Sequence, residues 1–220
     1  MYVVNGEGLF LMRRTKEESE KTREDILNAA VEVFTAKGVA RGTLEDIAKA
    51  ANVTRGAIYW HFKNKMEIFD ALHERLNRPL VDMIMADIEK DHPEPVAQLR
   101  DLCIQLLLGL DKDVQKRKAF VLFMQKCDYT GEFAKCKEKH CAQKAEKMRL
   151  FRRYFEKAKK AGKLPKGADP DLLTQAVGCF MKGIIYEYLE NPDGFNMKSK
   201  APKLVGLFFD NMGLTSKADV

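Results

Sequence analysis

The sequence lacks any apolar run long enough to cross a membrane. Its most apolar early stretch, residues 1–11, is brief and has no basic segment before it. No later stretch approaches the roughly 18 apolar residues that a transmembrane helix needs. We therefore expect a cytoplasmic protein that has no membrane partner.

The short motifs that mark many catalytic sites are also missing. The chain has no Gly-rich phosphate loop, no Gly-x-Ser-x-Gly segment and no His-Glu-x-x-His segment, and its carboxylates show no recognisable pairing. We expect neither enzyme activity nor a cofactor.

Strand-like segments, in which apolar and polar residues alternate, are absent as well, and apolar residues recur instead at three- and four-residue spacing. With 220 residues, 45% of them hydrophobic, the chain can bury one large or two modest helical cores. The fold class predicted from these patterns is all α. The net charge of +6 permits nucleic-acid binding without requiring it.

One segment carries an unusual run of ring side chains. Residues 59–62 are Tyr-Trp-His-Phe, and they follow Thr54, which can cap the first turn of a helix. A helix turns about 100° per residue, so four adjacent side chains cannot all face one core. Ile58 and Phe62 form the natural buried stripe. We therefore predict a short helix that displays its other side chains to a partner outside the domain.

A second short helix is predicted just before this one. Thr43-Leu44-Glu45-Asp46 has the pattern of a capping box, and apolar residues follow it at helical spacing. Residues 51–53 form a three-residue turn between the two helices. Such a pair, with polar and aromatic side chains displayed on its second helix, is typical of a helix-turn-helix that reads DNA.

The residues around this pattern resemble those of the tetracycline-repressor (TetR) family. The resemblance covers Thr22 to Leu72 and is carried by Ile26-Leu27-Asn28-Ala29-Ala30, Phe34, Gly38, Thr43, Ile47-Ala48, Ala51-Asn52-Val53 and Gly56-Ala57-Ile58-Tyr59-Trp60-His61-Phe62-Lys63-Asn64-Lys65. Within the family, residues 53–65 are similar to drug-efflux repressors of the AcrR and TtgR type. This resemblance implies an N-terminal three-helix DNA-binding domain and a C-terminal helical domain that binds a small-molecule inducer and forms the dimer.

Nine residues are predicted to meet DNA: Thr43, Thr54, Arg55, Gly56, Tyr59, Trp60, His61, Lys63 and Lys65. Arg55 is the best candidate to read a guanine edge, and the hydroxyls and ring N–H groups suit phosphate oxygens. Lys65 resembles the family's phosphate-contacting lysine. Because one reader contacts few bases, we expect a homodimer on near-palindromic double-stranded DNA, with recognition helices about 34 Å apart.

The chain is predicted to divide into an N-terminal arm (1–21), the DNA-binding domain (22–65), a connecting helix (66–90) and a ligand-binding and dimerisation domain (91–220). The first helix is expected at 22–37 and ends at Gly38. Later helices are expected at 96–110, 112–128, 132–161, 169–190 and 199–213. Pro79 is expected to kink the connecting helix or to mark a boundary in it.

The resemblance places several apolar side chains at ligand-contacting positions in the C-terminal domain. The predicted ligand site comprises Leu102, Cys103, Leu106, Phe120, Phe123, Met124, Cys127, Phe180, Met181 and Lys182. Methionine and phenylalanine adapt to varied apolar ligands, although such stripes are more often core. Lys182 replaces an acidic residue often found there, and a lysine facing a cavity would favour an anionic or phenolic ligand. Otherwise it is a solvated surface lysine.

The dimer surface is predicted on the last two helices, at Leu172, Ala176, Val177, Phe180, Ile184, Leu204, Leu207, Phe208 and Met212. Some of these side chains must also serve the core of a single protomer.

Two alternatives stay open. Cys136, His140 and Cys141 lie close together on one predicted helix, with Cys127 before them, so the protein could instead sense thiols or a soft metal. Residues 112–166 carry eighteen Lys and Arg against six Asp and Glu. That excess is either a solvated helical surface or a site for an anionic partner.

Overall fold

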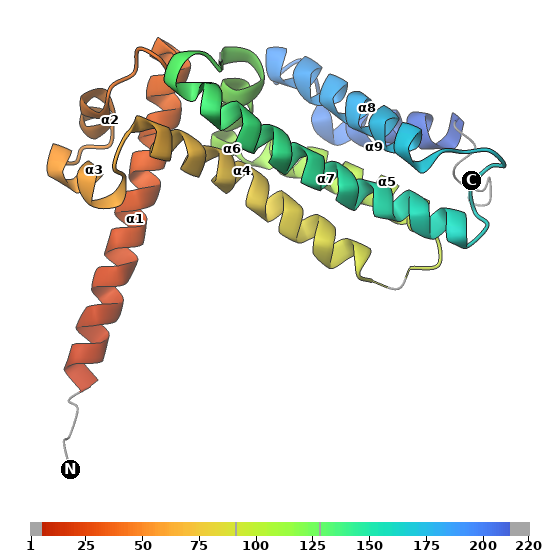
Figure 1. Ribbon diagram of the computed structural model, residues 1–220, viewed down its shortest axis with the longest axis horizontal. Coiled ribbons are helices and arrows are strands. Elements are labelled where there is room, and N and C mark those ends of the chain that lie inside the picture. The colour runs from red at the N-terminus through yellow and green to blue at the C-terminus, as the bar shows by residue number, and fades with distance from the viewer. Residues whose placement is uncertain (1–5, 91, 128, 212–220) are drawn as a thin grey trace.

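The computed structural model describes residues 6–90, 92–127 and 129–211, and every regular element in those residues is a helix. The α-helices are α1 (Gly6–Lys37), α2 (Leu44–Ala50), α3 (Arg55–His61), α4 (Lys65–Ile88), α5 (Pro95–Lys112), α6 (Val114–Val121), α7 (Ala134–Lys160), α8 (Pro170–Glu190) and α9 (Met197–Asn211). At one end, α2 and α3 lie beside α1, and α4 runs from them alongside a bundle formed by α5 to α9 (Figure 1). The all-α prediction is confirmed.

The N-terminal helices share one small core. Phe34 of α1, Ile47 of α2, Ile58 of α3 and Phe69 of α4 are each fully buried in a single cluster. Ala119 and Leu122, from α6 and the turn after it, and Phe133 join the same cluster. The N-terminal helices are therefore packed directly against the C-terminal half rather than joined to it by a linker.

A second apolar cluster fills the bundle. It contains buried side chains from α4, α5, α7, α8 and α9, including Leu99, Phe155, Val177 and Val205. The hydroxyl of Tyr154 on α7 donates to Asp87 on α4 over 2.8 Å. None of the helices in the described residues is both long and apolar enough to span a bilayer.

The first helix begins much earlier than predicted. Helix α1 starts at Gly6 instead of Thr22, so the expected arm and the first helix are one element up to Lys37. Thr22 resembles an N-cap in sequence, but its hydroxyl donates to the Glu18 carbonyl inside the helix over 2.9 Å. The end of α1 agrees with the prediction, because Gly38 follows it with φ of 81°.

One later prediction is narrowed and another needs correction. Helix α4 continues through Pro79, in agreement with the connecting helix expected at 66–90, so of the two roles expected for this proline the boundary is excluded. Pro79 is exposed, and water can therefore bond the carbonyl that proline leaves without a helix partner. The helix expected at 112–128 ends at Val121 and is followed by a π-helical turn, Leu122–Lys126. Asp113, whose side chain accepts from the Lys116 N–H over 2.9 Å, separates α6 from α5.

Candidate nucleic-acid interface

Helices α2 and α3 form the predicted helix-turn-helix. The Thr43 hydroxyl caps α2 by accepting from the Asp46 N–H over 3.1 Å, and Asp46 accepts from the Thr43 N–H in return. In the turn, Asn52 adopts φ of 53°, and the Val53 N–H donates to the Ala48 carbonyl over 3.0 Å. Asparagine tolerates this left-handed conformation. The turn was predicted, but its dihedral angle was not.

Helix α3 displays the face that the sequence predicted. Thr54 caps it by accepting from the Ala57 N–H over 3.1 Å, and Ile58 is fully buried. Tyr59 is 47% exposed and Trp60 is 82% exposed. A tryptophan this exposed leaves most of its apolar surface in water, which is costly for an isolated protein. The displayed face therefore fits an external partner.

Nothing inside the protein requires glycine at position 56. A Cβ added to Gly56 would meet only the Thr54 hydroxyl, at an ordinary distance of 3.8 Å. Glycine inside a helix costs about 1 kcal/mol relative to alanine. This cost without an internal packing reason is consistent with close approach of a partner to the α3 backbone.

Arg55 and Tyr59 form a pair on the displayed face. The Arg55 guanidinium donates to the Tyr59 hydroxyl over 3.3 Å and lies 5.6 Å from the ring centroid. That hydrogen bond raises the pKa of Arg55, which stays charged. His61, at the end of α3, is half-buried, and burial followed by the charge of Arg23 lowers its pKa. A neutral His61 can still donate one ring N–H to a phosphate.

Three other residues predicted to contact DNA are Thr43, Lys63 and Lys65. Thr43 and Lys65 already make hydrogen bonds within the protein. The Thr43 hydroxyl also donates to the Asp46 carboxylate over 2.8 Å, so capping accounts for this residue. Lys63 is exposed, whereas Lys65 donates to the Ala40 carbonyl over 2.8 Å and lies 5.3 Å from the Phe133 ring centroid. A phosphate contact by Lys65 remains a prediction, since its ammonium already ties α4 to the loop after α1.

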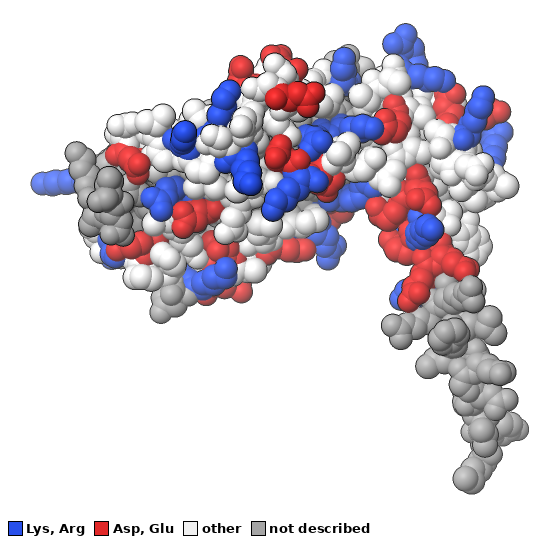
Figure 2. Space-filling model, turned by 180° about the vertical axis from the view of Figure 1, so that it is seen from behind, with Lys and Arg blue, Asp and Glu red and all other residues white. Residues whose placement is uncertain are grey.

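Charge does not concentrate at this end of the molecule. Figure 2 shows lysine and arginine side chains scattered among acidic ones on the face seen from behind, with acidic side chains gathered where α1 leaves the body. The Lys37 ammonium lies 2.6 Å from the Asp46 carboxylate, and with Thr43 it lowers the pKa of Asp46 to about 2. Basic side chains near the helix-turn-helix, α2 and α3, are therefore partly neutralised by acidic side chains of the same chain.

Comparison with known proteins decides the family. Residues 26–72 match the model of bacterial regulatory proteins of the tetR family, and residues 94–213 match that of the C-terminal region of MAATS-type transcriptional repressors. The chain is 32% identical over 205 residues to the HTH-type transcriptional regulator TtgR of Pseudomonas putida, covering 93% of this chain and 98% of the relative. The chain belongs to the TetR family.

Solved structures of the family are similar over nearly the whole length. NalD, the secondary repressor of the MexAB-OprM multidrug efflux pump in Pseudomonas aeruginosa, has a TM-score of 0.78 and 32% identity, covering 91% of this chain and 99% of NalD. SmeT of Stenotrophomonas maltophilia in complex with triclosan has a TM-score of 0.76 and 29% identity, covering 87% and 91% of the two chains. This TetR-family chain is thus a transcriptional regulator that has both the N-terminal DNA-binding domain and the helical C-terminal domain of the family.

The structure does not bring the predicted ligand residues of this regulator around one cavity. Leu102 and Cys103 are buried in the bundle core, and Met181 is 9% exposed there. The half-buried members are Leu106, Phe120, Met124 and Phe180, which pack against that core, and Phe123 and Cys127, which pack against the N-terminal cluster. Lys182 is exposed, so it does not face an enclosed apolar cavity. The ligand assignment remains a prediction.

The predicted dimer residues fall into two groups. Val177 and Ile184 are buried within the protomer, so these two cannot form its outer surface. Leu172 and Leu207 are 64% and 60% exposed. Ala176, Phe180, Leu204 and Phe208 are half-buried, with the rings of Phe180 and Phe208 stacked 4.4 Å apart, and Met212 lies outside the described residues.

The thiol- and metal-sensing alternative gains no support. Cys136 and His140 of α7 are buried, whereas Cys141 is exposed and Cys127 is half-buried. In the described part of the chain, no group of three or more His, Cys, Asp or Glu side chains is placed to hold a metal ion. Burial, followed by the charge of Asp70, raises the pKa of Cys136 to about 11, so this thiol stays protonated at neutral pH.

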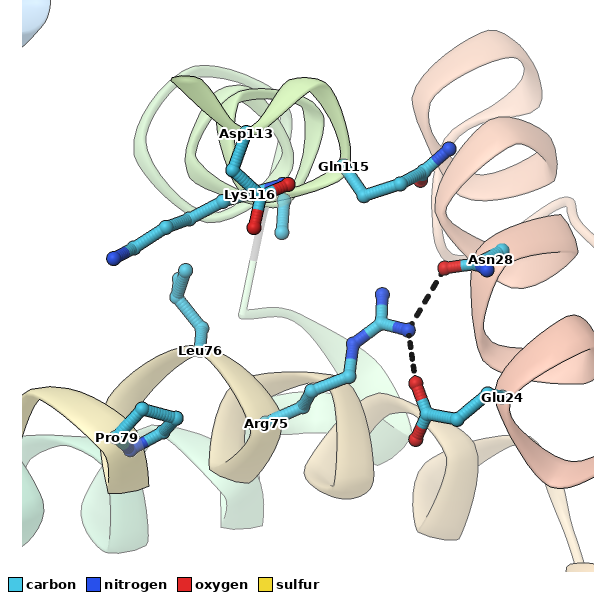
Figure 3. Close-up of a pocket in the computed structure, with 9 residues that line it drawn as sticks. Glu24, Asn28, Arg75, Leu76, Pro79, Asp113, Gln115 and Lys116 are labelled. Atoms are coloured by element: carbon cyan, nitrogen blue, oxygen red, sulfur yellow. Dashed lines mark hydrogen bonds and ion pairs between the residues drawn. The ribbon is translucent and has the colours of Figure 1, made fainter. Parts of the chain in front are cut away.

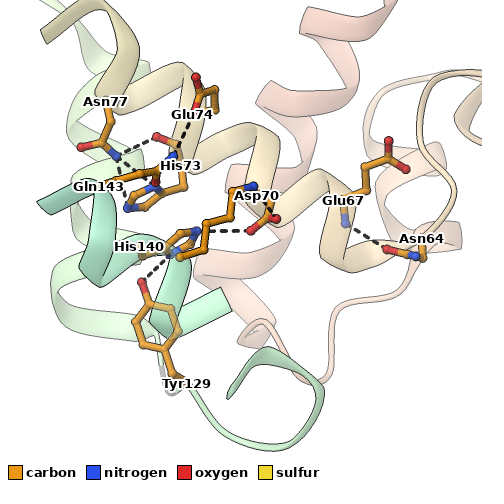
Figure 4. A network of polar contacts seen from close by, with 10 residues as sticks. Asn64, Glu67, Asp70, His73, Glu74, Asn77, Tyr129, His140 and Gln143 are labelled. Atoms are coloured by element: carbon orange, nitrogen blue, oxygen red, sulfur yellow. Dashed lines mark hydrogen bonds and ion pairs between the residues drawn. The ribbon is translucent and has the colours of Figure 1, made fainter. Parts of the chain in front are cut away.

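A buried polar network joins α4 to α7, and the sequence interpretation missed it. The imidazoles of His73 and His140 stack with centroids 3.4 Å apart (Figure 4). The Tyr129 hydroxyl is hydrogen-bonded to His140 Nδ1 over 2.8 Å, and the Asp70 carboxylate lies 3.3 Å from His140 Nε2. His73 and Asn77 stand four residues apart on the inner face of α4, which is the one signal that the sequence held.

A cavity of about 280 Å³ lies where α1, α4 and α6 meet. The Arg75 guanidinium of α4 reaches across to α1, where it donates to Glu24 over 3.0 Å and to Asn28 over 2.9 Å (Figure 3). On the other side, Lys118 of α6 pairs with Glu32 of α1. Arg75 and Lys118 therefore hold α1 to α4 and to α6 by charged contacts.

Proposed function

We propose that this protein is a homodimeric, cytoplasmic repressor of a multidrug efflux operon, released from double-stranded operator DNA by an apolar or amphipathic small molecule. The observation that carries the DNA-binding part is helix α3, whose displayed Tyr59 and Trp60 stand on a buried Ile58. NalD and SmeT, similar over nearly their whole length, are repressors of multidrug efflux pumps, and SmeT binds triclosan.

The contacts at the domain junction support a route for release. Arg75, Lys118 and Lys65 tie the C-terminal half to α1 and to the loop after it. A ligand that binds one arrangement of α4 and α6 better than the other therefore also biases the spacing of the two recognition helices in a dimer. Such coupling is typically worth about 1–3 kcal/mol, or 5- to 150-fold in affinity for DNA.

The experiment is a titration of the purified full chain against its own upstream intergenic DNA and against random DNA, at fixed near-physiological salt. We expect specific binding that a panel of apolar drugs weakens at least fivefold. Binding to both DNAs with equal affinity would contradict the proposal, since basic proteins bind any DNA in this salt-sensitive way. Specific binding that no ligand weakens would leave a DNA-binding protein without the sensing function.

A further inference from the structure

The cavity between α1, α4 and α6 is lined mainly by charged and amide side chains (Figure 3). Its volume of about 280 Å³ lies close to the lower end for small-molecule sites, which measure about 300–1,000 Å³. The side chains predicted to bind the inducer all lie in the described part of the chain, and none of them lines this cavity. Its charged and amide lining includes Glu24, Arg75, Asp113, Gln115 and Lys116.

Arg75 presents an unused edge of its guanidinium to this cavity. The Nη1 atom donates to Glu24 over 3.0 Å and to Asn28 over 2.9 Å, which holds the group in place. Within the described residues, Nε and Nη2 of Arg75 make no hydrogen bond. Figure 3 shows these remaining nitrogen atoms on the side of the guanidinium that faces α6. They form the parallel pair of donors that binds a carboxylate through two hydrogen bonds.

On the opposite wall, α6 supplies acceptors. The side-chain oxygen of Gln115 is buried, and no donor in the part of the chain that the structure describes reaches it. A buried polar atom without a hydrogen bond costs stability, so a donor in a bound molecule is favourable there. Asp113 caps α6 with one carboxylate oxygen, which accepts from the Lys116 N–H over 2.9 Å. The cavity therefore offers donors from α4 and acceptors from α6.

The charges around the cavity balance. Arg75 and Lys116 are positive, and Glu24 and Asp113 are negative. A bound anion or cation would leave one charge uncompensated, whereas a molecule that carries both signs keeps the balance. The size, the free donor pair and the buried acceptor thus suit a small zwitterion.

We propose that this cavity binds a small zwitterion of the α-amino-acid type with an apolar side chain. The carboxylate is held by Nε and Nη2 of Arg75, and the ammonium donates to the Gln115 oxygen and to Asp113. The apolar side chain packs on Leu76 and Ala119, which are 9% and 3% exposed and line the same cavity.

Such a molecule joins α4 to α6, and the Arg75–Glu24 pair extends this connection to α1. Helix α1 shares its core with α2 and α3, so occupancy of the cavity acts on the helices that carry the DNA-binding face. The site is a second effector site, distinct from that of the proposed apolar inducer. The inference therefore goes beyond the proposed function.

The test is calorimetric titration of the full chain at neutral pH, without DNA, with L-leucine, isocaproate and isoamylamine. Isocaproate lacks the ammonium of leucine, and isoamylamine lacks its carboxylate. We expect leucine to bind about tenfold more tightly than either analogue, because each analogue gives up charge-assisted hydrogen bonds. With leucine bound, hydrogen exchange should slow at residues 24–28 and 113–119, which line the cavity from α1 and α6.

Two substitutions on different helices locate the site. Arg75→Met removes the donor pair and should weaken leucine binding about tenfold. Gln115→Met removes the buried oxygen, keeps a side chain of similar length, and should weaken leucine binding about fivefold. Because that oxygen has no partner in the free protein, Gln115→Met should not lower the melting temperature. Arg78→Met, at an exposed arginine on the same helix, is the matched control and should bind leucine as the unaltered protein does.

The absence of leucine binding, equal affinities for leucine and both analogues, or leucine binding unchanged by both substitutions would overturn the inference. Protection from exchange only at other residues would overturn it as well. Gln115→Met keeps the test decisive if Arg75→Met fails to fold. Because the titration contains no DNA, its failure is separate from failure of the proposed function, which specific DNA binding released by apolar drugs would still support.

Discussion

At the residue scale, Arg55 and Tyr59 act as one unit on the displayed face of α3, because the guanidinium is held over the ring and bonded to its hydroxyl. Arg55→Ala should weaken binding to the protein's own operator by about 1–3 kcal/mol and reduce discrimination at one base position. Tyr59→Phe keeps the ring beneath the guanidinium and should cost less. Fluorescence anisotropy with the operator and its single-base variants measures both effects. Equal losses on every DNA for Arg55→Ala would remove its reading role.

Also at the residue scale, a substitution at Gly56 should change stability and DNA affinity in opposite directions. Gly56→Ala should raise the free energy of unfolding by up to about 1 kcal/mol, because the new methyl group meets nothing closer than 3.8 Å. It should nevertheless weaken DNA binding about tenfold if the backbone of α3 approaches the groove closely. Gly109→Ala, in α5 with no atom within 4 Å of its Cβ, is the matched control for helix propensity. An unchanged DNA affinity for Gly56→Ala would mean that nothing approaches the backbone there.

These two residues also show what a sequence can predict about a site. The buried stripe of α3 follows from spacing alone, so the display of Tyr59 and Trp60 was predicted correctly. The direction of a long flexible side chain does not follow from spacing. Lys65 bonds the Ala40 carbonyl because the loop after α1 returns to the start of α4, a tertiary contact that no local pattern encodes.

At the element scale, the junction of α4 and α7 should make stability depend on pH. Burial, followed by the charge of His140, lowers the pKa of His73 to about 3, and burial also lowers the pKa of His140. Histidine in the unfolded chain titrates near 6.5, so the unfolded state binds more protons and stability falls as pH drops below about 6.5. Asp70 opposes this shift, and Lys147 adds to it.

His73→Phe should remove part of that dependence, because its ring can still stack on His140 but cannot be protonated. Between pH 7.5 and 5, the unaltered protein should lose about 1–2 kcal/mol more than the variant in the free energy of unfolding. Urea unfolding at the two pH values measures the difference. His92→Gln, at an exposed histidine, is the control and should track the unaltered protein. Identical pH dependence for His73→Phe would show that His73 is not held neutral.

The contact between α4 and α1 gives a second prediction for elements. Arg75→Met removes the bonds to Glu24 and Asn28 and should destabilise the junction by about 1 kcal/mol. Hydrogen exchange of α1 amides near residues 24–28 should become faster. Arg78→Met is the matched control on the same helix, because Arg78 is exposed and lies 3.8 Å from Glu74. Equal exchange in both variants would show that the Arg75 contacts do not hold α1.

At the scale of the whole molecule, helix positions were predicted well and inter-helix contacts were not. Helices α5, α7, α8 and α9 begin and end within a few residues of the expected bounds, since turn residues such as Gly162 and Pro170 mark them. The early start of α1 was missed, because Thr22 carries a local signal that the surrounding helix overrides, whereas the connecting helix expected at 66–90 is present as α4. The stacked pair His73 and His140 joins elements far apart in sequence, so only the fold reveals it.

The assembled molecule gives the last prediction. Leu172 and Leu207 expose 64% and 60% of their surface on α8 and α9, where a second copy can bury them. Leu207→Glu should place a charge in the proposed interface and convert the proposed dimer to a monomer, as sedimentation velocity measures. Operator affinity should fall by at least 100-fold, because one recognition helix reads too few bases, while the melting curve at low protein concentration should change little. Val114→Glu is the control: Val114 is a 51% exposed apolar residue at the start of α6, outside α8 and α9. A dimer that survives Leu207→Glu and Leu172→Glu together would place the interface elsewhere on the molecule.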